Sequence, residues 1–69
     1  MNAVDRILSK LGETDAAIAR ELSLTRPAIG VWRRKGKIPH WNIGRIESAA
    51  DRLGVIIPRR DLVAAVMGE

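Results

Sequence analysis

The side chains most able to do chemistry in this chain are its cations, and they are unevenly distributed. Between Leu22 and Ile46 there are six basic residues and no acidic ones. These residues are Arg26, Arg33, Arg34, Lys35, Lys37 and Arg45. The rest of the chain has six basic and eight acidic residues, whereas the whole chain carries a net charge of +4. The positive charge is thus concentrated in one stretch, a pattern expected of a protein that binds a polyanion.

Groups for enzymatic or metal chemistry are scarce. The 69 residues include no cysteine and a single histidine, His40, so thiolate metal sites and histidine pairs for zinc are excluded. No carboxylate pair, nucleophile with a base, or glycine-rich phosphate loop stands out. We therefore expect a protein that is not an enzyme, with no catalytic residue, metal or cofactor. The acidic side chains of Asp51 and Asp61, beside Arg52 and Arg60, are interpreted as surface charges.

Composition predicts one small globular domain over residues 1–69. The hydrophobic fraction of 46% is too high for a disordered chain. No apolar run approaches the ~20 residues of a membrane span, and the first five residues do not resemble a signal peptide. We expect a cytoplasmic protein. Because a domain of this length buries only about 60% of its unfolded surface, well-packed helices or a partner chain must stabilise it.

The spacing of apolar residues predicts an all-α bundle of about five short helices. In the first segment Val4, Ile7, Leu8 and Leu11 lie at helical spacing, and Gly12 follows as an expected left-handed cap. The remaining segments end at further glycine and proline residues. The β-branched run at 55–57 is either an extended link that fills the core or a short pairing strand. The predicted helices cover about 2–11, 14–22, 25–34, 40–53 and a short segment after Pro58.

The third predicted helix carries much of the positive charge. Thr25 is a suitable N-cap, and Pro27 falls in the first turn, where a missing N–H costs nothing. Ala28, Ile29 and Trp32 share one face, so Trp32 is predicted to be buried. On the other face lie Arg26, Gly30 and Arg33. We also expect His40 at the surface. For Trp41 a place in the core near Ile38 is favoured, and the alternatives are a contact with the DNA backbone or a subunit interface.

Only Ser23 and Leu24 separate the second predicted helix from Thr25, and the small Ala19 would allow the two helices to cross closely. The stretch from Ala16 to Arg34 resembles the Cro/repressor-type family of helix-turn-helix DNA-binding proteins of phages and bacteria. The resemblance covers about residues 7–53. The run Ile-Gly-Val-Trp-Arg-Arg-Lys-Gly-Lys-Ile-Pro at 29–39 is similar to a subgroup of small Cro-like regulators.

This resemblance implies a lambda-repressor-like domain with its helix-turn-helix at about 15–34. It implies a sequence-selective regulator of transcription that binds double-stranded DNA, with the helix at 25–34 in the major groove. The sequence departs from the family at Ser23, where glycine is common, and at Gly30 and Val31, where polar residues are common. The candidates for base readout are Arg26, Gly30, Val31 and Arg33. The candidates for phosphate contact are Thr14, Thr25, Arg34, Lys35 and Lys37.

A homodimer is the expected assembly, because two half-sites supply the affinity that one small domain lacks. The candidate dimerisation segment is 55–69, whose apolar residues could alternatively complete the core. Two other functions use the same surface. One is a protein-interaction module with a polymerase- or antitoxin-type partner that docks on Gly30 and Val31. The other is a non-specific nucleoid-associated or RNA-binding protein. Affinity for target and random duplexes at physiological salt distinguishes the three.

Overall fold

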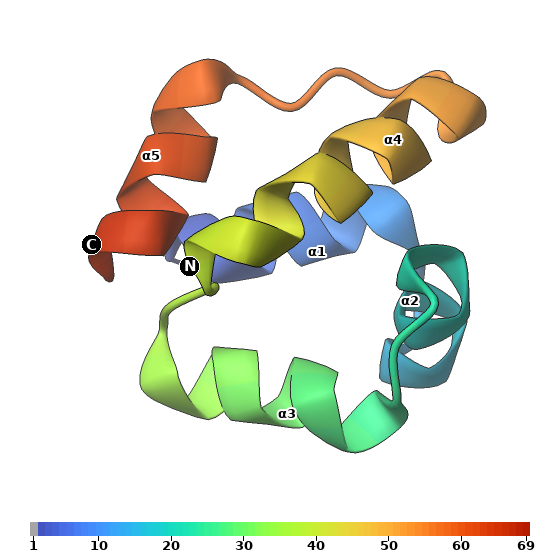
Figure 1. The fold of residues 1–69 in the computed structure, drawn as a ribbon, viewed down its shortest axis with the longest axis horizontal. Coiled ribbons are helices and arrows are strands. Elements are labelled where there is room, and N and C mark those ends of the chain that lie inside the picture. Colours follow the sequence, from blue (N-terminus) through green and yellow to red (C-terminus); the bar gives the residue numbers. More distant parts are fainter. Residues whose placement is uncertain (1) are drawn as a thin grey trace.

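Five α-helices joined by short connections make up residues 2–69, the part of the chain that this computed structural model describes (Figure 1). This part contains no strand, so the predicted all-α architecture is confirmed. It measures 25 × 24 × 22 Å, and none of its helices has the length and apolar character needed to cross a bilayer. The elements in order are α1 (Ala3–Leu11), α2 (Asp15–Leu22), α3 (Arg26–Lys35), the 3-10 turn η1 (His40–Asn42), α4 (Ile43–Leu53) and α5 (Arg59–Met67).

Helix α1 forms the centre of the bundle. Its N-cap is Asn2, whose Oδ1 accepts a hydrogen bond from the backbone N–H of Asp5 at 2.9 Å. The four apolar residues predicted to share a face are all buried. The expected left-handed cap at Gly12 is wrong, because its φ of 172° is extended backbone. A Cβ at Gly12 would lie 3.1 Å from Cγ1 of Ile18, so this glycine allows the start of α2 to approach closely.

Helices α2 and α3 are joined by a three-residue turn. Helix α2 begins after Thr14, whose Oγ1 accepts from the N–H of Ala17 at 3.1 Å. It ends at Ser23, which adopts the left-handed conformation with φ 57° and ψ 40°. The N–H of Leu24 donates to the carbonyl of Ala19 at 2.8 Å and closes the turn. The helices of the predicted motif therefore lie within about one residue of their expected bounds.

The back of α3 is anchored in the core. Ile29 is fully buried, and Trp32 is 4% exposed, as predicted. After the helix the chain passes through Ile38, which is also fully buried and whose N–H donates to the carbonyl of Ala65 in α5 at 3.0 Å. The connection after α3 is therefore attached to the C-terminal half of α5.

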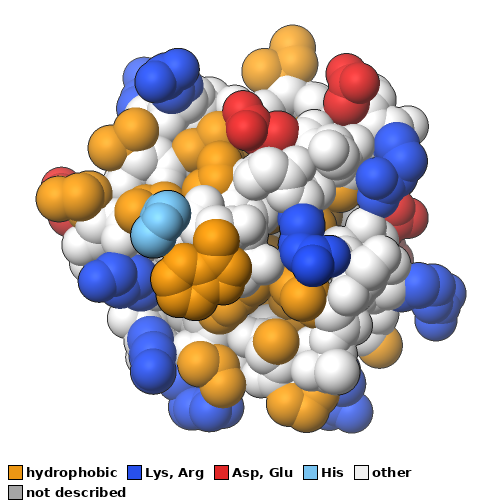
Figure 2. Space-filling view, in the orientation of Figure 1, with side chains coloured by type: hydrophobic (Ala, Val, Ile, Leu, Met, Phe, Trp, Pro, Cys, Tyr) orange, Lys and Arg blue, Asp and Glu red, His pale blue; other side chains and the backbone are white. Residues whose placement is uncertain are grey.

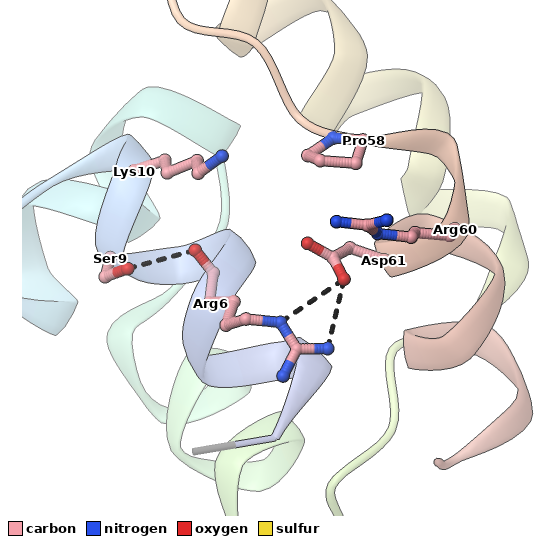
Figure 3. A pocket seen from close by; sticks show the side chains of 6 residues that line it. All are labelled: Arg6, Ser9, Lys10, Pro58, Arg60 and Asp61. Atoms are coloured by element: carbon pink, nitrogen blue, oxygen red, sulfur yellow. Dashed lines mark hydrogen bonds and ion pairs between the residues drawn. The ribbon is translucent and has the colours of Figure 1, made fainter.

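An ion pair attaches α5 to α1. Nε and Nη2 of Arg6 donate to Oδ1 of Asp61 at 3.2 and 3.0 Å (Figure 3). The interpretation of Asp61 as a surface charge is wrong, because it is only 8% exposed. Asp61 lies in the first turn of α5, whose packing against α1 turns the carboxylate inward. The sequence does not show this contact because 55 residues separate the two side chains.

The segment between α3 and α4 exposes a tryptophan. Trp41 is 72% exposed, so its predicted place in the core is wrong, whereas His40 is exposed as expected. The cause is η1, whose three residues turn so that Asn42 is buried and Ile43 packs against the core. Between α4 and α5, Val55 and Ile57 also pack on the core, but Ile56 is 83% exposed.

Candidate nucleic-acid interface

The two ends of α3 fix how it presents its side chains. Thr25 is the N-cap by position, although its side chain makes no capping hydrogen bond, and Pro27 occupies the first turn. At the other end Gly36 is left-handed, with φ 63°, and its N–H donates to the carbonyl of Trp32 at 2.8 Å. Because Ile29 and Trp32 face the core, the opposite side of the helix faces solvent.

A hollow of about 410 Å³ lies on this outer side of α3, and we call it the α3 hollow. It contains three of the four residues predicted to read bases. The helix backbone is accessible at Gly30, which has no side chain. A Cβ built there would meet only Nη1 of Arg34, at 3.5 Å. A partner backbone or base edge can therefore approach the helix closely. The lining residues are Asp15, Arg26, Pro27, Gly30, Val31 and Arg34.

The fourth predicted base reader, Arg33, is held by carboxylates from two other helices. Its Nη1 donates to Oδ1 of Asp5 at 2.8 Å, and its Nε donates to Oδ1 of Asp15 at 2.9 Å. Only 35% of its side chain is exposed. Arg33 therefore attaches α3 to α1 and α2, and it compensates the negative charge of Asp15 at the edge of the α3 hollow.

Among the residues that the structure describes, no carboxylate pairs with four cations of the basic stretch. Within residues 2–69 no acidic side chain lies within 4.0 Å of the charged groups of these residues, all of which are exposed. Their charges are free to meet an anion. Arg45 differs, because its Nη1 donates to the carbonyl of Leu22 at 3.3 Å and so binds the end of α2. The four cations are Arg26, Arg34, Lys35 and Lys37.

The two threonines predicted to contact phosphate lie at helix starts. Thr14 caps α2 and Thr25 precedes α3, and both are exposed. The N-terminus of a helix presents free N–H groups and a positive dipole end, which favour an anion. The hydroxyl of Thr14 is already the acceptor for Ala17, whereas that of Thr25 makes no capping bond.

Asp15 and Pro27 also line the α3 hollow, although neither is among the residues predicted to contact DNA. The sequence feature that could have identified them is their position in the first turns of two helices joined by a short turn. Trp41 is not among the predicted site residues, because its proximity to Ile38 favours the core over a DNA contact or an interface, yet it is exposed.

The exposed cations of this surface are suited to binding an anion. Guanidinium groups offer paired N–H donors that match the edge of guanine or a phosphate, and lysines supply point charges. Residues 2–69 contain no group of three or more acidic or histidine side chains arranged to hold a metal ion. No protein family model, curated protein or solved structure matches this chain.

Proposed function

We propose that this chain is a sequence-selective regulator of transcription that binds double-stranded DNA with α3 in the major groove. One observation carries the proposal. Helix α3 exposes cations around the α3 hollow, which Gly30 helps to line. Ile29 and Trp32 anchor the other face of the helix in the core. A helix with one rigidly held face and one cationic face has the dimensions and charge that the major groove accepts.

The roles of the side chains follow from their positions. Arg26 lies in the α3 hollow, has no acidic partner within residues 2–69, and is the best-placed donor to the O6 and N7 acceptors of guanine. Gly30 permits the close approach, and Val31 can contact a thymine methyl group. Arg34, Lys35 and Lys37 would contact phosphates, together with the two threonines at the helix starts. Arg33 acts by positioning α3 and by compensating Asp15.

We also propose that two copies bind two half-sites. Ile56, Val63 and Met67 are large apolar residues in 55–69 that remain exposed, which supports a dimer formed through this segment. Half-sites about one helical turn apart would match a two-fold dimer. A regulator of this kind must reach bacterial or phage DNA, so we propose that it acts in the bacterial cytoplasm.

The direct test is selection of bound duplexes from a random pool at about 150 mM salt. We expect one enriched sequence with two related halves, and loss of preference at a base pair with Arg26→Ala. Binding without enrichment would support the nucleoid-associated alternative instead. Absence of any complex with duplexes of any sequence would reject DNA binding altogether.

A further inference from the structure

A second hollow, of about 370 Å³, lies where α3, the connection that follows it and α5 meet. We call it the Trp41 hollow. Trp32 and Ile38, both buried, line its inner part, and most of its other lining side chains are also apolar. An apolar recess of this size accommodates a bulky aliphatic or aromatic side chain. Its outer lining includes Val31, Lys35, Lys37, His40, Trp41 and Val66.

Trp41 leaves a large apolar surface in water at the edge of this hollow. Its ring contacts that of His40 edge-on, with centroids 5.2 Å apart and planes at 78°. Figure 2 shows the pale-blue histidine beside a broad orange hydrophobic group on this face, with blue cationic groups nearby. A tryptophan that is 72% exposed in a small domain costs solvation free energy unless a partner covers it.

The charge around the hollow indicates what would cover Trp41. Lys35 and Lys37 line it, whereas no carboxylate does. Duplex DNA could meet the lysines, but it presents no apolar side chain for the recess. A second copy meeting this face in two-fold symmetry would bring its own Lys35 and Lys37 toward the first pair, which is unfavourable.

We infer that the Trp41 hollow binds an acidic segment of another protein. A bulky apolar side chain of that segment fills the recess against Trp41 and Val66, and flanking carboxylates pair with Lys35 and Lys37. An amphipathic helix or an extended peptide supplies both features within a few residues.

The position of this hollow gives such a partner control over DNA. Val31 lines both hollows, and Lys35 and Lys37 are proposed phosphate contacts. The same lysines cannot pair with peptide carboxylates and DNA phosphates at once, so the two ligands compete. This competition rests on the proposed function, whereas binding of the acidic segment does not. The segment would release the regulator from its operator.

The test uses displayed random peptides of about twelve residues, selected against the full chain. We expect enriched peptides with Asp and Glu around a Leu, Ile or Phe. A synthetic enriched peptide should shift the emission of Trp41 to shorter wavelength as the ring loses water. Trp41→Ala should weaken binding by at least about 30-fold. Absence of enrichment, enrichment of basic or purely polar peptides, or undiminished binding by Trp41→Ala would overturn the inference.

Charge reversal supplies the matched control. Lys35→Glu with Lys37→Glu should abolish binding of the acidic peptide, whereas Lys10→Glu, at an exposed lysine lining a different hollow, should leave it unchanged. Adding the peptide to a protein–duplex complex should release the duplex. Peptide binding without any duplex binding would reject the proposed function alone, and simultaneous binding of both would reject the competition. Loss of self-association in Trp41→Ala would overturn the inference, because it would identify a second copy of the chain as the occupant of the hollow.

Discussion

The guanidinium of Arg33 lies between carboxylates of two other helices, and this determines its contribution to the proposed DNA contact. Arg33→Ala would leave Asp5 and Asp15 uncompensated beside the α3 hollow. We expect duplex affinity to fall several-fold for all sequences alike, with a larger loss at low salt, where charge repulsion is screened least. Binding titrations on target and random duplexes measure this effect.

Asp15→Asn provides the control for this prediction. In the Arg33→Ala background it should recover part of the lost affinity, because it removes the repelling charge. The unfolding free energy should fall by about 1 kcal/mol or less for each broken ion pair, since these side chains are about one-third exposed. Loss of preference at a single base pair, with no recovery by Asp15→Asn, would show instead that Arg33 reads a base.

The two tryptophans provide a contrast between a buried and an exposed ring. Trp32→Ala should lower the free energy of unfolding by about 3–5 kcal/mol, because it leaves a cavity behind α3. Trp41→Ala should change it by less than about 0.5 kcal/mol, since that ring is mostly in water. Urea titrations followed by far-UV circular dichroism compare the two variants. Equal stabilities would mean that Trp32 does not anchor the helix.

The turn between α2 and α3 depends on a strained residue. Ser23 has φ 57°, a conformation that costs an L-residue about 1–2 kcal/mol and glycine almost nothing. Ser23→Gly should therefore raise the free energy of unfolding by about 0.5–1 kcal/mol, after the extra entropy of an unfolded glycine is subtracted. Ser48→Gly, in the exposed middle of α4, should lower it by about 0.5 kcal/mol. Destabilisation by both substitutions would contradict this account of the turn.

Gly30 makes helix α3 less stable than alanine would. A substitution there can therefore change the free energy of unfolding and the affinity for DNA in opposite directions. Gly30→Ala should raise the free energy of unfolding by up to about 1 kcal/mol, because the new Cβ meets only the flexible end of Arg34. The same methyl would obstruct close approach at the α3 hollow and reduce affinity for the selected duplex. Thermal unfolding and duplex titration of one sample measure both effects.

Gly44→Ala is the matched control for the Gly30 substitution. It adds the same group to an exposed position of α4, where nothing lies within 4 Å. It should preserve or raise stability without affecting duplex binding. If Gly30→Ala binds the duplex as tightly as the original chain, then this part of α3 does not enter a groove.

Local signals were sufficient to predict the elements, but not the contacts between them. Helix bounds and the burial of Trp32 follow from apolar spacing and capping residues within a few positions. The environments of Trp41, Asp61 and Arg33 depend on partners far along the chain or on how a short turn rotates. For the candidate site, the sequence identified the cationic surface. It could not distinguish Arg26, which faces the open hollow, from Arg33, which is held by carboxylates.

Cations in the proposed interface and cations elsewhere on the molecule should contribute differently to DNA binding. The chain carries +4, so long-range attraction to DNA depends on the entire charge distribution. Counterion release depends only on the cations that contact phosphates. Lys37 belongs to the proposed interface. Lys10 is also exposed, but it lines a hollow beside α5 and donates to the carbonyl of Ile56 at 2.9 Å.

Neutralising each of these two lysines in turn distinguishes the effect of a phosphate contact from the effect of net charge on DNA affinity. Lys37→Ala should weaken binding to every duplex and reduce the slope of log affinity against log salt by about one unit. Lys10→Ala removes the same charge, yet it should leave the slope unchanged, because no phosphate contact is lost there. Titrations from low to physiological salt with the selected and a random duplex give both slopes. If the two variants behave alike, the chain attracts DNA through its overall charge, and the proposed placement of α3 in the groove is wrong.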